Sequence, residues 1–76
     1  MRKKVDTTFL KTFGNNLKMV RVSKNITQAQ LAIDCDFDVS VISRIERGIV
    51  NTSLSNLKLI SSALNIPLKE LFDFEN

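Results

Sequence analysis

Histidine is absent from this chain of 76 residues, and cysteine occurs once, at Cys35. Zinc sites in proteins are built from clusters of Cys and His, so no zinc site is expected. A single cysteine cannot form an internal disulfide, which favours a reduced, intracellular setting. Unpaired cysteines are among the most buried residues, and we therefore expect Cys35 to be a core residue and not a redox group.

Glycine is also scarce, with two residues in all, and the sequence contains no glycine-rich loop of the kind that binds phosphate groups. Without histidine, and with one cysteine at an apolar-periodic position, the chain offers no convincing pair of nucleophile and base. An enzyme is therefore not expected. No cofactor and no small-molecule ligand are predicted.

Long apolar runs are missing too, so no segment of the sequence is expected to span a bilayer. The start Met1-Arg2-Lys3-Lys4 is basic, but the apolar stretch of a secretory signal does not follow it. A cytoplasmic protein without membrane association is the expectation. The length suits one domain over residues 1–76, and residues 1–7 contain too few apolar side chains to pack, so we expect them to be flexible.

Charge is distributed unevenly along the chain. The net charge is +3, and the first 24 residues contain seven Lys and Arg but a single acidic residue, Asp6. This distribution is expected if the N-terminal part approaches a polyanion. For residues 2–4 taken alone, a solvated basic tail is an equally good interpretation.

Apolar side chains recur at helical spacing in most of the sequence, which shows no strand pattern and no internal repeat. A first helix is predicted from about Thr8 to Lys24, with Gly14 inside it at a propensity cost of about 1 kcal/mol. A fourth helix is predicted after the cap Ser53, with Leu54, Leu57, Ile60, Ala63 and Leu64 on its apolar face. A fifth, Leu68 to Phe72, follows Pro67. The predicted fold is therefore all-α, a compact domain of five helices.

The stretch from Thr27 to Gly48 organises the rest, because it predicts two short helices joined by a tight turn. Thr27 is a good N-cap with Gln30 as its capping-box partner. The triplet Asp36-Phe37-Asp38 then interrupts the apolar pattern. Asp38 caps the next helix, Val39 to Arg47, and Gly48 is suited to end it in the left-handed conformation.

The alternating acidic residues of this turn have a second possible interpretation, a calcium-binding loop. Asp34, Asp36 and Asp38 have the alternation of such a loop, but the glycine and the terminal glutamate of that motif are missing. Turn and cap roles explain the three residues more simply. No metal site is predicted.

The same stretch resembles the helix-turn-helix of the lambda-repressor and Cro family of DNA-binding proteins. The residues that carry the resemblance, within a likeness that extends from about Phe13 to Phe72, are Thr27-Gln28, Leu31-Ala32, Ile42-Ser43, Ile45-Glu46 and Gly48. The resemblance implies a helix-turn-helix at the second and third helices. It also implies a sequence-specific transcriptional regulator whose partner is double-stranded DNA.

By position in that motif, the third helix is the recognition helix, whose N-terminal residues meet base edges in the major groove. The expected base contacts are Asp38, Val39, Ser40, Ser43 and Arg44. Arg44 is the best candidate, since its planar fork can pair with guanine, although a phosphate contact or a surface ion pair remains the alternative. Expected phosphate contacts are Thr27, Gln28, Arg47 and Asn51, with a solvated loop as an equally good interpretation of the last two.

Two aspartates depart from the family pattern. Asp38 stands where the family usually has Ser or Thr, and an acidic cap near phosphates costs electrostatic energy, although it can accept a hydrogen bond from cytosine. Asp36 replaces a glycine that is common in the turn, and aspartate tolerates left-handed geometry better than most residues. Arg21 and Glu46 match positions that form a partly buried ion pair in many family members.

Family members usually bind palindromic sites as two-fold dimers, and a homodimer is predicted here. Its expected interface is formed by apolar residues of the loop and the C-terminus, Ile49, Val50, Phe72 and Phe74. The alternative is that Phe72 closes the core and the others are scattered surface residues. The chain looks like phage Cro-type repressors and the controller proteins of restriction-modification systems, with its size slightly favouring a controller. A different class, an antitoxin-type protein-binding module with secondary DNA binding, usually needs an added segment that wraps its partner, and none is visible.

Overall fold

The computed structural model describes residues 5–75, and these residues form helices without any strand. The elements in chain order are α1 (Thr7–Ser23), α2 (Gln28–Cys35), α3 (Val39–Arg47), α4 (Leu54–Ala63) and the 3-10 helix η1 (Leu68–Phe72). The prediction of an all-α fold is confirmed. Of the segment expected to be flexible, residues 1–4 lie outside the described part, and Thr7 is already the first residue of α1. Within the described part no helix is long and apolar enough to cross a membrane.

The segment predicted as a fifth helix is a 3-10 helix, so the count of five helices is not confirmed: the described residues form four α-helices and one short 3-10 helix. In η1 the hydrogen bonds join residues three apart, from the Glu70 amide to the Pro67 carbonyl at 3.0 Å and from the Asp73 amide to the Glu70 carbonyl at 3.3 Å. This pattern is that of a 3-10 helix, which proteins use in short pieces. With five residues, the segment is too short to gain much from α-helical bonding.

Each α-helix begins with a side chain that accepts a hydrogen bond from its first turn. Thr27 and Gln30 form the predicted capping box, with both reciprocal bonds present. Asp38 caps α3 and Ser53 caps α4, as expected. Asp6 caps α1 by accepting from the Phe9 amide at 2.9 Å, a cap that the periodicity alone did not indicate. These caps satisfy amides that have no partner within the helix.

The α-helices all end with a residue in the left-handed conformation at or just after the last turn. The positive φ angles belong to Asn25, Asp36, Gly48 and Asn65, at 58°, 57°, 72° and 57°. Asn and Asp are, after glycine, the residues that adopt this conformation most readily. The left-handed geometry expected for Asp36 is therefore present, and the turn between α2 and α3 is formed without glycine.

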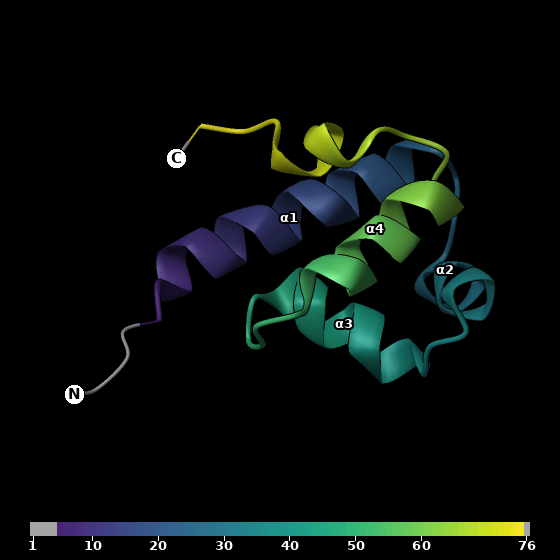
Figure 1. Ribbon diagram of the computed structural model, residues 1–76, viewed down its shortest axis with the longest axis horizontal. Coiled ribbons are helices and arrows are strands. Elements are labelled where there is room, and N and C mark those ends of the chain that lie inside the picture. Colours follow the sequence, from purple (N-terminus) through teal and green to yellow (C-terminus); the bar gives the residue numbers. More distant parts are fainter. Residues whose placement is uncertain (1–4, 76) are drawn as a thin grey trace.

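The core lies where α1, α2, α3, α4 and η1 meet (Figure 1). Its buried apolar members are Phe13, Leu17, Leu31, Ala32, Cys35, Ile42, Ile45, Leu57, Ile60, Leu64 and Leu71. The core role of Cys35 is thus confirmed. Leu54 was wrongly assigned to the apolar face of α4, since it is 69% exposed: it lies in the first turn, and the buried face of this helix begins at Leu57.

Gly14 explains how closely α1 approaches the recognition helix. A Cβ atom at this position would clash with the carbonyl oxygens of Ile45 and Glu46 in the last turn of α3. The absence of a side chain at Gly14 therefore allows α1 to cross closely over α3, and this close packing offsets the helix-propensity cost of glycine. Asn16, two residues further along α1, donates to the carbonyls of Glu70 and Leu71 at 3.1 and 2.9 Å and holds η1 on the same helix.

Candidate nucleic-acid interface

The recognition helix α3 is held from behind by two isoleucines and open on its other side. Ile42 is fully buried and Ile45 is 3% exposed, and both belong to the core cluster. In Figure 1 the helix lies at the border of the molecule, next to α2. Nine residues give it a length of about 13 Å, which matches a major groove about 12 Å wide.

The residues expected to contact bases lie on the accessible side of α3. Val39 is 45% exposed and Arg44 is exposed, while Ser40 and Ser43 are partly buried. Val41 was assigned no role, and it packs against the core cluster with Ile42 and Ile45. The arrangement brings the predicted base contacts together at one surface. Their contacts with bases remain a prediction.

Asp38 is committed to capping α3 and keeps its negative charge there. Its Oδ1 accepts from the Ser40 amide at 2.9 Å. Hydrogen bonds from the backbone and the hydroxyl of Ser40, and then the positive charge of Arg44, lower the pKa of this carboxyl. A carboxylate therefore stands at the point where the helix would enter a groove.

The four expected phosphate contacts all lie at helix ends or in the loop after α3. The Thr27 hydroxyl accepts from the Gln30 amide at 3.1 Å, so its own hydrogen remains available to donate. Arg47 is exposed, and its Nε donates to the Ser43 carbonyl at 3.3 Å. Asn51 is exposed in the loop between α3 and α4. None of these positions obstructs a role in binding phosphates.

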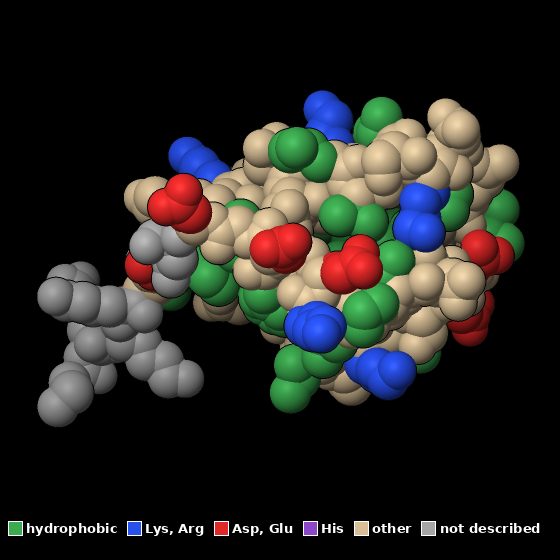
Figure 2. Space-filling view, turned by 90° about the horizontal axis from the view of Figure 1, so that it is seen from above, with side chains coloured by type: hydrophobic (Ala, Val, Ile, Leu, Met, Phe, Trp, Pro, Cys, Tyr) green, Lys and Arg blue, Asp and Glu red, His purple; other side chains and the backbone are tan. Residues whose placement is uncertain are grey.

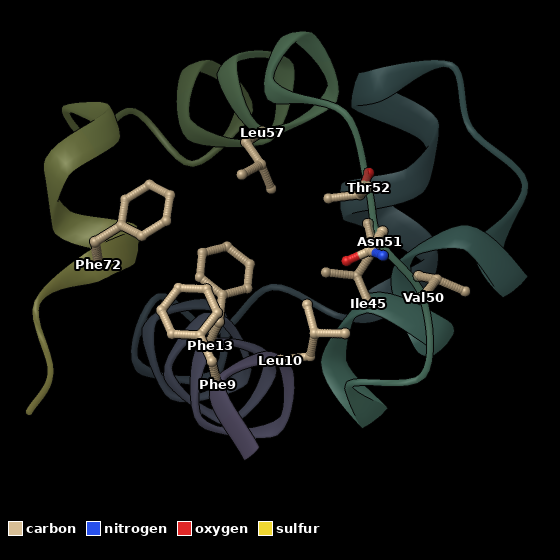
Figure 3. Close-up of a pocket in the computed structure, with 9 residues that line it drawn as sticks. All are labelled: Phe9, Leu10, Phe13, Ile45, Val50, Asn51, Thr52, Leu57 and Phe72. Atoms are coloured by element: carbon tan, nitrogen blue, oxygen red, sulfur yellow. The ribbon is translucent and has the colours of Figure 1, made fainter. Parts of the chain in front are cut away.

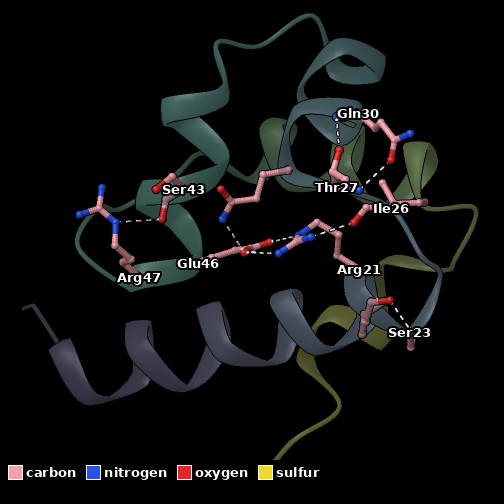
Figure 4. A network of polar contacts seen from close by, with 10 residues as sticks. Arg21, Ser23, Ile26, Thr27, Gln30, Ser43, Glu46 and Arg47 are labelled. Carbon is pink, nitrogen blue, oxygen red and sulfur yellow. Dashed lines mark hydrogen bonds and ion pairs between the residues drawn. The ribbon is translucent and has the colours of Figure 1, made fainter.

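Arg21 and Glu46, the expected ion pair, form a buried fork between α1 and α3 (Figure 4). The Arg21 Nε lies 2.7 Å from Glu46 Oε2, and Nη2 lies 3.0 Å from Oε1, with the two side chains 9% and 2% exposed. The third nitrogen, Nη1, donates to the Ile26 carbonyl at 2.8 Å. The hydrogen bond to Glu46 raises the pKa of Arg21, although burial opposes it.

Gln28, the fourth expected phosphate contact, is joined to this ion pair. Its Nε2 donates to Glu46 Oε1 at 2.9 Å, and the residue is half-buried at the start of α2. The sequence placed Gln28 near DNA and Glu46 in the fold but gave no signal that the two touch. They are 18 residues apart, and only the angle between α2 and α3 brings them together.

The four residues expected at a dimer interface lie in the loop after α3 and in the C-terminal segment, and two of them line the same cavity. Val50 and Phe72 line one apolar cavity of about 170 Å³ between α1, the end of α3 with the loop that follows it, α4 and η1 (Figure 3). Ile49, in the loop between α3 and α4, is 56% exposed. Phe74 instead packs on α1, with its ring centre 5.8 Å from that of Phe9. Phe72 does the same in part, at 5.1 Å from Phe13, yet stays 39% exposed.

The surface on the side of the C-terminal segment does not look like a site for a polyanion. Viewed from there, the Lys and Arg side chains of the described residues are interspersed with Asp and Glu, and these residues form no continuous basic patch on this face (Figure 2). Glu70, Asp73 and Glu75 belong to this segment. The side of α3 is therefore the better candidate for contact with DNA.

Comparison with known families decides the class of this fold. A family with the description Helix-turn-helix matches residues 17–71. The chain belongs to the helix-turn-helix family. This match includes α2, the turn and α3, together with both members of the buried ion pair, and the function expected from the motif, a DNA-binding transcription regulator, is confirmed.

Among helix-turn-helix proteins, several controllers resemble this chain. Control protein C.BamHI from Bacillus amyloliquefaciens is 46% identical over 63 residues, which cover 82% of this chain and 78% of that protein. Control protein C.MunI from Mycoplasma sp is 46% identical over 61 residues, covering 79% and 82%. The crystal structure of the restriction-modification controller protein C.AhdI from Aeromonas hydrophila superposes with a TM-score of 0.84 at 37% identity, over 86% of this chain and 98% of that one.

Proposed function

We propose that this regulator controls the genes of a restriction-modification system by binding palindromic DNA as a homodimer. The observation that carries the proposal is the combination of an exposed polar side on α3, backed by Ile42 and Ile45, with similarity to controllers along most of the chain. The likeness to C.AhdI covers nearly the whole length of that protein. A controller fold therefore accounts for most of this chain.

Binding uses two helices with different tasks. The start of α3 enters the major groove, where Arg44 pairs with guanine and Val39 meets a thymine methyl group. The start of α2, with Thr27 and Gln28, faces a phosphate of the backbone, because the first amides of a helix and its dipole attract anions. Arg47 and Asn51 add phosphate contacts on the other side of α3. The ion pair of Arg21 and Glu46 fixes the angle of α3 against α1.

A homodimer supplies the second half-site. The exposed Ile49 and the cavity that Val50 and Phe72 line are apolar surface that a second copy would cover. A two-fold dimer then spaces the two α3 helices about one turn of DNA apart, roughly 34 Å. Phe74 contributes by holding the C-terminal segment on α1, beside Phe72.

DNA selection with a salt titration tests this function. Oligonucleotides recovered from a random pool by the chain should contain an inverted repeat with half-sites about one helical turn apart. The affinity for the selected duplex should fall steeply as salt rises, since each phosphate contact releases a counterion. Recovery of no common sequence, or an affinity that barely responds to salt, would contradict the proposal.

Sedimentation equilibrium tests the dimer. Phe72→Ser should shift the chain toward monomer and weaken binding to the palindrome, while Ile33→Ser serves as the matched control. Ile33 is 76% exposed on α2 and is not among the predicted interface residues. A monomer at high micromolar concentration that also fails to pair on DNA would contradict the dimer.

A further inference from the structure

We propose that Glu46 is a positioning residue for DNA binding, which holds the Gln28 side chain ready to donate to a backbone phosphate. This inference rests on the proposed function, in which Gln28 contacts a phosphate. Gln28 is the first residue of α2 and Glu46 lies in the last turn of α3. The hydrogen bond of 2.9 Å from Gln28 Nε2 to Glu46 Oε1 joins the two helices of the DNA-binding motif.

The acceptor in this bond is itself fixed. Two nitrogens of Arg21 hold the Glu46 carboxylate from the side of α1, at 2.7 and 3.0 Å, and the Glu46 side chain is 2% exposed (Figure 4). Arg21 is anchored in turn by the Ile26 carbonyl at 2.8 Å, just before α2. Because every member is held from a different element, the carboxylate is a rigid reference point for the Gln28 amide.

The chemistry of the amide leaves Gln28 able to bind DNA at the same time. Its Nε2 carries two hydrogens, and the bond to Glu46 uses one of them. The residue is half-buried, so the amide lies between the buried carboxylate and the surface at the start of α2. Arg21 neutralises the charge of Glu46, and a neutralised carboxylate repels an approaching phosphate much less than an unpaired one.

A side chain that is already held loses less freedom on binding. Immobilising a long, flexible side chain weakens an affinity by about two- to tenfold, and glutamine has three rotatable bonds. Glu46 removes much of this loss before DNA arrives. The prediction is therefore a specific coupling: the contribution of Gln28 to DNA affinity should depend on whether Glu46 is present.

A cycle of variants measures this coupling, using the duplex recovered by the selection described above. Gln28→Ala is compared in the unmodified chain and in the Arg21→Met/Glu46→Met variant, where removal of both charges together leaves no stranded ion. Gln28→Ala should weaken binding about tenfold in the unmodified chain and about threefold or less in the double variant. Gln30→Ala is the matched control: the same residue type in the same helix start, bonded to Thr27, should lose the same factor in both backgrounds.

Equal losses for Gln28→Ala in the two backgrounds would overturn the inference while leaving the proposed function intact. No loss in the unmodified chain would overturn the inference and also the phosphate contact of Gln28. Absence of salt-dependent binding by the unmodified chain would contradict the proposed function as well. Should the double variant fail to fold, ¹⁵N relaxation of the unmodified chain decides. The side-chain amide of Gln28 should be about as rigid as the backbone and should shift when the duplex is added. Mobility equal to that of the exposed Asn65 amide would refute the positioning role.

Discussion

Removing one partner of the buried ion pair should damage this fold far more than removing both. In Arg21→Met the Glu46 carboxylate, with its side chain 2% exposed, would be left facing apolar surroundings with one hydrogen bond from Gln28. In Glu46→Met the guanidinium would be stranded instead. A charge left buried in this way typically costs about 3 to 5 kcal/mol.

The size of the chain makes that loss severe. At about 0.05 to 0.15 kcal/mol per residue, 76 residues have a free energy of unfolding of roughly 4 to 11 kcal/mol. Either single variant should therefore lose about a quarter of its stability or more, and its melting temperature should fall by about 12 °C or more. The Arg21→Met/Glu46→Met variant strands no charge, and similar exchanges of buried ion pairs for apolar residues are often neutral or stabilising.

Urea unfolding followed by far-UV circular dichroism measures all four proteins of this double-mutant cycle. The coupling free energy between the two residues should amount to several kcal/mol, with unchanged slopes of stability against urea. High salt should change the coupling little, because the pair is screened from solvent by α1 and α3. Additive losses, with the double variant less stable than either single variant, would refute the reasoning that the cost comes from a stranded buried charge.

Three other substitutions test the remaining structural arguments. Gly14→Ala should destabilise the fold by about 2 kcal/mol or more, despite the better helix propensity of alanine, because the added Cβ meets two α3 carbonyls. Asn15→Ala, at the exposed neighbouring position, should be close to neutral in the same urea assay. Arg44→Ala should lose about 1 to 3 kcal/mol of sequence preference at one base pair per half-site, measured in competition with duplexes changed at single positions. Lys69→Ala, which removes the same charge from η1, should keep that sequence preference. The third substitution, Asp38→Asn, tests the cap of α3. Because Ser40 lowers the pKa of Asp38, the stability from this cap is fully present above about pH 4, the pKa of an unfolded aspartate, and is lost as the pH falls through the lower folded value. Asp38→Asn should therefore show a smaller loss of melting temperature in acid than the unmodified chain, and equal acid sensitivity would contradict the assignment.

Local signals predicted much of this fold because they depend on residues close together in the chain. Thr27 and Gln30 form a capping box three residues apart, and Gly48 ends α3 in the left-handed conformation by its own conformational freedom. Asn25 and Asp36 end helices in the same way. The helical periodicity then indicated which face of α3 is buried, and with it the surface available to DNA.

Apart from the ion pair of Arg21 and Glu46, which the family resemblance implied, contacts between distant segments escaped prediction. Gly14 looked like a weakness of α1, since nothing in the local sequence shows that α3 crosses at that point. Leu54 fitted the period of α4, yet it lies in the first turn and remains exposed. The bond from Gln28 to Glu46 depends on the angle between α2 and α3. The C-terminal segment has only five residues, so its local pattern could not distinguish a 3-10 helix from an α-helix.

The ion pair itself requires an explanation beyond stability. A buried pair generally stabilises a protein no more than well-packed apolar residues of the same volume would, and in so small a chain such a replacement is readily made. Arg21 and Glu46 nevertheless are two of the three buried polar residues of the described segment, and both connect to the start of α2 through Ile26 and Gln28. Apolar residues would fill the space but would give the Gln28 amide nothing to bond. Stability and DNA affinity should therefore separate in the Arg21→Met/Glu46→Met variant, which should unfold at a urea concentration close to that of the unmodified chain and bind the selected duplex more weakly. A variant equal to the unmodified chain in both measurements would leave the pair without a function in DNA binding.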